Sequence, residues 1–577
     1  MPAIRLPVLI LCLLVIGSGH LSATDAFRQY LALDATAAEQ QERVADYDTL
    51  LELLGEAIPA GSSDELDQAR AALAAIDAEQ EAWKSDPELA AADAAFGKAY
   101  GEKTRIVIEQ LLMPFPGFAA AAARREAIDQ ELAGLGDLAE LAPDQALHVA
   151  ALTRERNHLA RGMEVATWRV WKTPWGAPLV AEQDQAIDAA EKQLKKRPQP
   201  DKQSRKSQKN ARKAVEAATQ QALASYAAFA WAVQAAAEAE AALAATRSQI
   251  DELKEQTLNA GATRATASYA MPPRKGKEQK PSKAELWLPP GVTTVRGLVL
   301  GHPPDLGTKI ATTTAVRFAA ATHGCGTLTF KSFDAMFNYG PEKKAGERLQ
   351  AVLDDLAQQT GHPELAQAAL LAVGHSTSGI FARNIAYWAP ERSLGVIHIK
   401  SGNMHQHRPD PERSLAGVPF IAINGEYEVF GPEGGLRAEY DKQTQWVMIR
   451  EQLLRRRQTD PDHLLSLVVH AGGGHGGWSG DLSRLCGLFV DKACRSRLPT
   501  EPGQACTKLT AQDGWLTDAR LKNPRHPPAA WADYAGDKQD AFWHFDQEMA
   551  EAVRSYHDGA FFSPDPAIDH PVPADWP

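Results

Sequence analysis

The sequence carries no excess of positive charge and very little cysteine. Its 61 Lys and Arg residues are outnumbered by 73 Asp and Glu residues, which gives a formal net charge of −12. This balance argues against a dedicated nucleic-acid-binding protein. The five cysteines do not follow the ligand spacing of a zinc site, so the sequence implies no metal. A chain of 577 residues with 44% hydrophobic content fits a soluble globular protein of several domains.

Long apolar runs are missing, and only a short one occurs at the N-terminus. Leu6 to Ile16 follow Arg5 and are too few to span a bilayer comfortably. Gly17 to Gly19 end the run, and Leu21-Ser22-Ala23 forms a plausible cleavage site. We therefore predict a signal peptide over residues 1–23, a secreted or periplasmic protein, and no membrane span after cleavage. An uncleaved anchor is the alternative.

The cysteines that remain after signal cleavage are even in number. Loss of Cys12 with the signal would leave four cysteines in an oxidising compartment, where disulfides form, and four cysteines allow three pairings. We favour Cys494 with Cys506, which closes a short loop, and Cys325 with Cys486, which ties the start of a strand to a later helix.

Residues 27–258 show almost no strand pattern. Alanine, glutamate, glutamine and leucine dominate, and all four favour helices. Residues 211–255 lack proline and predict one long helix. The basic run from Lys192 to Lys213 contains one acid, Asp201, and reads as a solvated loop; binding to an anionic polymer or membrane surface is the alternative. We expect an all-α domain, either a bundle or an antiparallel coiled coil. Its role is structural, or else it presents substrate, binds a partner or contacts the cell envelope.

The pattern changes after this region. Residues 259–283 are rich in Thr, Ala, Gly, Pro and Lys and read as a linker. From residue 284 onward, strand and helix patterns alternate, which is typical of a parallel sheet. We therefore assign an α/β fold class to residues 284–500, preceded by the all-α domain. Residues 501–577 are expected to pack on the α/β domain as a C-terminal extension, with a helix at 538–557.

The stretch Leu371 to Gly379 reads Leu-Ala-Val-Gly-His-Ser-Thr-Ser-Gly. An apolar run meets a turn of small residues centred on Ser376, and helical spacing follows. Strand, tight turn and helix are the context of a nucleophile elbow. Gly374 fits the G-x-S-x-G pattern, whereas Ser378 stands where glycine is usual. At these residues the sequence resembles the α/β-hydrolase superfamily, over roughly residues 287–499.

The resemblance implies a catalytic triad whose nucleophile, acid and histidine follow in that chain order, each after a strand. Residues 418–424 read as a buried strand that runs into an acidic turn, and residues 464–470 as a strand that opens into a glycine-rich loop. The implied triad is Ser376, Glu428 and His475, with the glutamate where the family usually has aspartate. Glu426 competes for the role of the acid.

The resemblance also implies an oxyanion hole of two backbone donors. One is the amide of Thr377, and the second belongs to the loop after the strand at residues 297–300. That loop contains two prolines, which have no N–H, so His302, Asp305 or Leu306 remain as the second donor; we name His302. Substrate-binding side chains are expected at the carboxyl ends of the strands. They are Tyr339, Asn403 and Trp478.

The sequence therefore predicts an exported serine esterase that cleaves carboxylic esters, polymeric ones included, through an acyl-enzyme at Ser376. It implies no cofactor and no nucleic-acid partner, and it leaves the oligomeric state open. An insertion at residues 431–457 is either a lid or the ordinary helix between two strands. The rival functions are a serine peptidase of the same fold and a non-catalytic envelope scaffold with a degenerate hydrolase domain.

Overall fold

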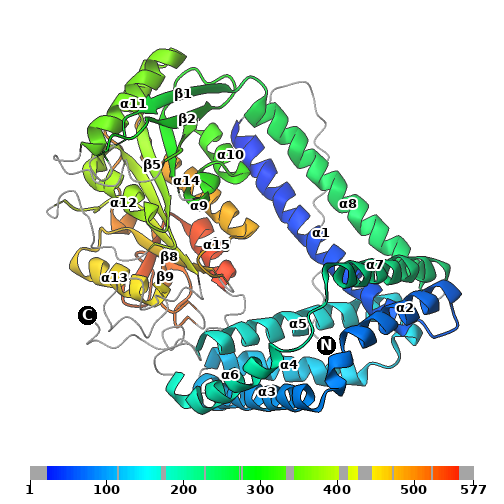
Figure 1. Ribbon diagram of the computed structural model, residues 1–577. Helices are drawn as coiled ribbons and strands as arrows, with labels where there is room; N and C mark the ends of the chain where they lie inside the picture. Colours follow the sequence, from blue (N-terminus) through cyan, green and yellow to red (C-terminus); the bar gives the residue numbers. More distant parts are fainter. Residues whose placement is uncertain are drawn as a thin grey trace.

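The computed structural model consists of a helical domain and an α/β domain that lie side by side (Figure 1). It describes residues 23–113, 116–170, 177–226, 229–271, 273, 277–303, 305–332, 344–401, 413–425, 445–470, 473–521 and 524–557. The predicted signal peptide lies outside the described residues, apart from Ala23. Across the described part of the chain, no helix is both long and apolar enough to cross a membrane.

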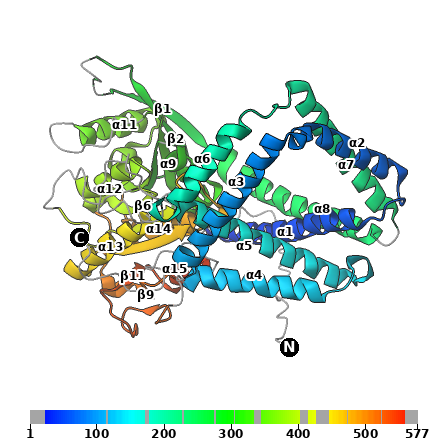
Figure 2. The ribbon, with the colours of Figure 1, turned by 60° about the horizontal axis from the view of Figure 1, so that its bottom comes forward.

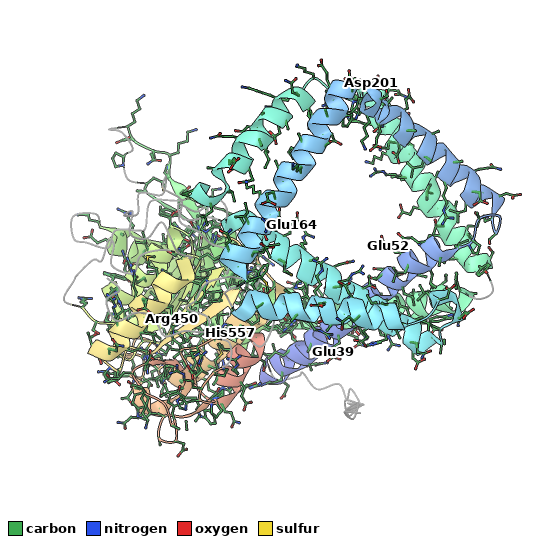
Figure 3. The ribbon with its side chains drawn as sticks, turned by 90° about the horizontal axis from the view of Figure 1, so that it is seen from below. Glu39, Glu52, Glu164, Asp201, Arg450 and His557 are labelled. Carbon is green, nitrogen blue, oxygen red and sulfur yellow. The ribbon has the colours of Figure 1, made fainter. Side chains whose placement is uncertain are left out.

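The helices of the helical domain pack side by side in pairs, and the row of pairs closes where α5 meets α1. Its helices pack in nested pairs, α1 with α8, α2 with α7, α3 with α6 and α4 with α5, and α5 returns to contact α1. Figures 2 and 3 show these pairs along the sides of a triangle. The bounds are α1 (Ala23–Ala57), α2 (Asp64–Gln80), α3 (Pro87–Ile106), α4 (Pro116–Gly134), α5 (Pro143–Val170), α6 (Ala181–Leu194), α7 (Lys202–Ser225) and α8 (Ala230–Lys254). The predicted all-α domain is confirmed.

The single long helix predicted over residues 211–255 is wrong. Helix α7 ends at Ser225, and Tyr226 takes an extended conformation. The ring of Tyr226 packs 4.9 Å from that of Phe229, at a corner where α1, α2, α5, α7 and α8 share an apolar core. Phe229 is buried in this core and Tyr226 is partly buried against it, and helix propensity alone does not indicate a break at this position.

The basic run is also more ordered than predicted. Its first residues belong to α6, which ends at Leu194, and α7 begins at Lys202, so only the stretch between the two helices is a loop. The carboxylate of Asp201 accepts a hydrogen bond of 2.7 Å from the backbone N–H of Ser204, so the one acid of the run caps the helix N-terminus. Figure 3 shows Asp201 at an outer corner of the helical domain.

The α/β domain is built on an eight-stranded sheet with the order β1-β2-β4-β3-β5-β6-β7-β8. Strand β2 is antiparallel to both its neighbours, and β3 to β8 run parallel. The predicted fold class, a mostly parallel α/β sheet preceded by an all-α domain, is confirmed. The bounds are β1 (Thr263–Tyr269), β2 (Ser282–Leu288), β3 (Gly297–His302), β4 (Cys325–Phe330), β5 (Ala369–His375), β6 (Ser393–Ile399), β7 (Phe420–Gly425) and β8 (Leu465–His470).

Strand β1 lies inside the segment predicted as a linker. It pairs with β2 in an antiparallel register from Thr263 opposite Leu288 to Tyr269 opposite Ser282. Ala267 and Tyr269 are buried against the core and Ala265 is partly buried there, whereas Thr266 and Ser268 are exposed. This alternation is the period of a half-buried strand, and the small polar residues of the segment concealed it.

Helices cover both faces of the sheet. One apolar core lies under α11 (Ala345–Thr360), α12 (Ser378–Trp388) and α13 (Gln445–Thr459), and the other under α10 (Thr314–Thr322) and α14 (Gly480–Arg497). In α13, Trp446, Met448 and Leu453 are buried, and the helix packs on β7 and β8. Over residues 445–457 the insertion is therefore the ordinary helix between two strands and not a lid.

The C-terminal extension packs on this domain with a small sheet and a helix. The sheet has the order β10-β9-β11, and its strands are β9 (Trp515–Asp518), β10 (Ala529–Ala530) and β11 (Ala541–His544). Helix α15 (Gln547–His557) packs on α14. The helix predicted from residue 538 starts later, because the four residues of β11 are all buried as a strand.

Helix α1 joins the two domains. The ring of Tyr30 stacks on that of Phe318 in α10 at 4.9 Å, and Arg484 of α14 forms a 2.6 Å ion pair with Asp34. The helical domain is thus attached to the α10–α14 face of the sheet through both apolar and charged contacts.

The cysteines of the described residues are free and buried, which differs from both predicted disulfides. Cys325 lies beside Cys494, with the two Sγ atoms 3.9 Å apart. Cys486 and Cys494 stand eight residues apart on α14, roughly 12 Å along the helix axis. The start of β4 therefore lies beside Cys494 and not beside Cys486, the partner that the sequence favoured.

Candidate active site

Ser376 sits on a sharp turn between β5 and α12. Its φ is 57°, a left-handed conformation that non-glycine residues rarely adopt, and its backbone N–H donates a 2.8 Å hydrogen bond to Ile399 O in β6. A Cβ at Gly374 would overlap the Ser378 carbonyl and lie 2.8 Å from Gly379 N. The turn is therefore as tight as the predicted nucleophile elbow requires.

Ser378, which departs from the glycine of the family pattern, is fully buried. Its Oγ accepts a 2.8 Å hydrogen bond from the His375 N–H and can donate to the carbonyl of His375 at 2.8 Å or of His302 at 3.2 Å. The hydroxyl thus closes the turn and ties it to the end of β3. The serine fits here because its side chain points into a polar pocket of backbone groups.

His475 reaches the serine from the loop after β8. Its Nε2 lies 2.9 Å from Ser376 Oγ, although the two residues are 99 positions apart in the chain. His375 supports this arrangement, because its Nε2 donates a 3.0 Å hydrogen bond to the backbone carbonyl of His475 and the two rings lie 4.9 Å apart. The structure therefore brings together the serine and the histidine that the sequence singled out.

The two residues named for the oxyanion hole lie in different environments. Thr377 is exposed and stands at the N-cap of α12, where the N–H groups of the first turn have no partner within the helix. The His302 ring is fully buried between Phe330 and Phe381, and burial lowers its pKa to about 4. Its imidazole is therefore neutral and forms part of the core.

The loop after β3 nevertheless borders the elbow. Helix α9 (Asp305–Ala311) starts immediately after it. A Cβ at Gly307 would lie 3.3 Å from both His375 N and Ser378 Oγ. Asp305 and Leu306 directly precede this contact, so a backbone donor from this stretch remains the prediction for the second half of an oxyanion hole.

Of the predicted substrate-binding residues, only Trp478 is described. Its Nε1 donates a 2.9 Å hydrogen bond to Ser483 Oγ on α14, and the side chain is half-buried against the core on that face. Both acid candidates, Glu428 and Glu426, lie outside the described residues. The same holds for Asn403 and Tyr339.

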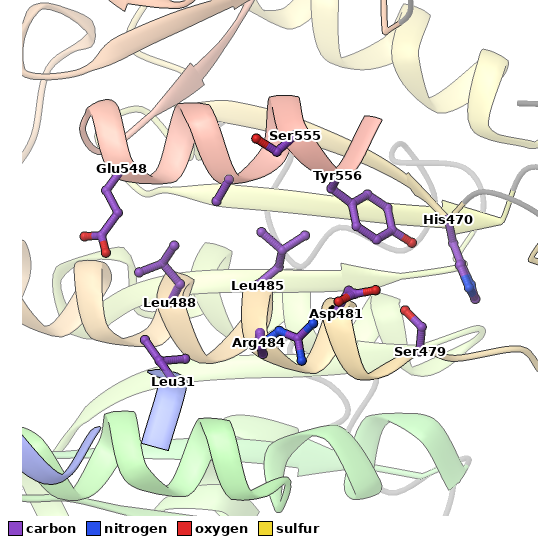
Figure 4. A pocket seen from close by; sticks show the side chains of 11 residues that line it. Leu31, His470, Ser479, Asp481, Arg484, Leu485, Leu488, Glu548, Ser555 and Tyr556 are labelled. Atoms are coloured by element: carbon purple, nitrogen blue, oxygen red, sulfur yellow. Dashed lines mark hydrogen bonds and ion pairs between the residues drawn. The ribbon is translucent and has the colours of Figure 1, made fainter. Parts of the chain in front are cut away.

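A cleft that the sequence did not indicate lies beside the histidine loop, between α1, α14 and α15 (Figure 4). Its volume is about 670 Å³, and Leu31, Leu485 and Leu488 supply part of an apolar wall. His470 and Ser479, one at each end of the histidine loop, also line it. Residues from three distant parts of the chain form this cleft, so no local pattern marks it.

Comparisons with known proteins find likeness in structure only. The sequence matches no protein-family model and no curated protein. An S-formylglutathione hydrolase from Agrobacterium tumefaciens is 13% identical, with a TM-score of 0.26 over 41% of this chain and 94% of that one. An esterase domain of a Rhodothermus marinus protein is 16% identical, with a TM-score of 0.23 over 40% of this chain and 99% of that one. FphF, a fluorophosphonate-binding serine hydrolase of Staphylococcus aureus, is 12% identical, with a TM-score of 0.26 over 40% of this chain and 98% of that one.

Proposed function

We propose that this protein is a serine hydrolase that cleaves carboxylic esters. One observation carries the proposal: the 2.9 Å contact between His475 Nε2 and Ser376 Oγ, made at a strained turn that exposes the serine. A serine hydroxyl is a weak nucleophile at neutral pH and needs an adjacent base. The imidazole stands within hydrogen-bonding distance of the proton that it would remove.

The proposed reaction begins at this serine–histidine pair. Ser376 Oγ attacks the ester carbonyl carbon while His475 Nε2 takes the hydroxyl proton. The oxyanion that forms accepts a hydrogen bond from the amide of Thr377 and from a second donor in the loop after β3. The imidazolium then protonates the leaving alkoxide, which leaves an acyl group on Ser376. Water activated by His475 releases the acid, and Glu428 stabilises the imidazolium throughout.

An open site favours substrates larger than a simple ester. Ser376 is half-exposed, and Thr377 and His475 are exposed, so the reacting atoms lie at the surface of the described structure. A chain end or side group of a polymeric ester can approach such a pair without entering a deep cavity. We propose such esters as the substrate class, and export as the route to them, in keeping with the N-terminal signal pattern.

Steady-state hydrolysis with matched variants tests the activity. We expect p-nitrophenyl esters to be turned over with an initial burst of nitrophenol, and peptide p-nitroanilides to be turned over far more slowly. Ser376→Ala is expected to lower ester turnover by about 10³-fold or more. Ser248→Ala, at an exposed serine on α8, is the control and should leave turnover unchanged.

Three outcomes would contradict the proposal. Ester turnover that survives Ser376→Ala would exclude this serine as the nucleophile. Preferential cleavage of the anilides would establish the peptidase alternative. A folded protein without activity on either substrate would support the scaffold alternative.

Mass spectrometry of the N-terminus after expression with export tests the signal peptide, because cleavage is expected after residue 23.

A further inference from the structure

Lys400 is a fully buried lysine at the carboxyl end of β6, next to the elbow. Its φ is 45°, a left-handed conformation that lysine rarely adopts. Its backbone N–H donates a 2.6 Å hydrogen bond to Ile423 O in β7. The backbone is therefore fixed by the sheet, and the left-handed turn directs the side chain away from the strand direction.

The ammonium group of Lys400 contacts the histidine loop. It donates hydrogen bonds to the backbone carbonyls of Gly474 and Gly477, and it lies 3.4 Å from His470 Nδ1. An ammonium has three donors and no acceptor, so His470 Nδ1 accepts in this arrangement. Hydrogen bonds from a charged donor are stronger than neutral ones, and the two carbonyls come from both sides of His475.

The loop needs such support because of its composition. Residues 471–477 read Ala-Gly-Gly-Gly-His-Gly-Gly, with five glycines around His475. Glycine loses more conformational freedom on ordering than any other residue. A 2.9 Å contact between His475 Nε2 and Ser376 Oγ therefore requires anchors outside the loop's own backbone.

We infer that Lys400 is a positioning residue, which holds the loop at Gly474 and Gly477 so that His475 stays within reach of Ser376. The inference rests on the proposed function. Lys400 acts through the backbone on either side of the histidine, and His375 supplies a further hydrogen bond to the carbonyl of His475. Loss of the lysine would let the imidazole move away from the serine, and a displacement of about 1 Å at a reacting group costs on the order of 10²-fold in rate.

Lys400→Met tests the inference, because it keeps an unbranched side chain and removes the three donors. We expect kcat for an ester to fall about 10²-fold with KM little changed, since the side chain lies beneath the loop. The matched control is Lys492→Met. Lys492 is also buried, and its ammonium pairs with Asp546 and Glu548 between α14 and α15, so its loss should leave kcat unchanged.

A double-mutant comparison separates positioning from general stability. In the His475→Ala background, Lys400→Met should leave the residual rate unchanged, because its effect passes through the missing imidazole. A role in the fold alone would lower the rate in both backgrounds, and that result would overturn the inference. Wild-type kcat in folded Lys400→Met would overturn it as well. If Lys400→Met does not fold, Lys400→Gln keeps a shorter donor and serves as the second variant, with a smaller loss of kcat expected.

Hydrogen exchange keeps the inference testable if the proposed function fails. In the Lys400 variant, amides of residues 473–479 are expected to exchange faster than in wild type, whereas α12 stays unchanged. Unaltered exchange across this segment would refute the anchoring by Lys400, whatever the protein turns over. Activity that is independent of Ser376 would refute the proposed function, and the hydrogen-exchange result would still stand.

Discussion

Gly374→Ala tests the elbow at the position where the chain leaves least room. The added methyl group would overlap the carbonyl of Ser378 and lie 2.8 Å from Gly379 N, and both contacts are to backbone atoms. No side-chain rotation relieves such a clash, so the turn itself must shift. Overpacking of this kind costs about 1–3 kcal/mol of unfolding free energy, and a shift of about 1 Å at Ser376 would lower the rate on the order of 10²-fold.

The same substitution in a helix provides the control. Gly97 lies exposed within α3, and a Cβ there would meet no atom within 4 Å. Gly97→Ala is therefore expected to raise the unfolding free energy by about 0.5–1 kcal/mol through helix propensity, without any effect on Ser376. Replacing glycine by alanine is thus expected to lower the free energy of unfolding at Gly374 and to raise it at Gly97.

Urea unfolding followed by tryptophan fluorescence gives the stability, and the rate of fluorophosphonate labelling gives the reactivity of the serine. Gly374→Ala should be less stable than wild type and label slowly, whereas Gly97→Ala should be at least as stable and label normally. A Gly374→Ala protein that labels at the wild-type rate would show that the turn is not the constrained elbow described above.

Three further predictions concern other parts of the structure. Ser378→Ala leaves the buried N–H of His375 without its acceptor, and should cost about 1–3 kcal/mol in urea unfolding; an unchanged midpoint would contradict the described bond. Burial holds four histidines neutral in the folded protein, so below about pH 6.5 protons bind preferentially to the unfolded chain. The free energy of unfolding should therefore fall from about pH 6.5 toward pH 4. The expected fall is up to about 1.4 kcal/mol per pH unit for each histidine. Their lowered pKa values are about 4 for His302 and about 3 for His398, His544 and His557. Urea titrations from pH 8 to 4 measure this, and a flat profile would contradict it. Finally, peptide mapping after oxidation should find Cys325 linked to Cys494, whose Sγ atoms lie 3.9 Å apart; a Cys494–Cys506 peptide would contradict the structure.

The sheet was largely predictable because each parallel strand is buried on both faces. Such strands appear as short apolar runs bounded by turns, as in residues 369–375 and 465–470, and their order along the chain indicates the fold. Strand β1 was not predicted because its residues on the core side are few, namely Ala267, Tyr269 and the partly buried Ala265. Its other residues are small or polar and resemble a linker.

The helical domain was predictable in type but not in shape. Alanine-rich composition indicates helices, yet the break after Ser225 lies at a corner where five helices share an apolar core that Phe229 and Tyr226 join. The nested pairing of α1 to α8 likewise depends on contacts between residues far apart in the chain, such as Gln41 and Arg247, which are 206 positions apart. No local pattern encodes these contacts.

The residues of the candidate site also fall into two groups, those that a local sequence pattern marks and those whose role only the fold reveals. Ser376 and His475 carry local signals, namely a small-residue turn after a strand and a glycine-rich loop after another. The supporting residues carry none: the hydroxyl of Ser378 and the ammonium of Lys400 acquire roles only from backbone groups that folding brings to them. The left-handed conformation of Lys400 is visible only in three dimensions.

The most direct measurement of the central claim is fluorophosphonate labelling of the mature protein, followed by mass spectrometry of the modified peptide. An activated serine is expected to give a single adduct at Ser376, absent from Ser376→Ala and reduced to background in His475→Ala, because the reagent reacts only with a serine that a base has made nucleophilic. A well-folded wild-type protein that takes up no label would contradict the account. Labelling of Ser376→Ala and His475→Ala at the wild-type level would contradict it as well.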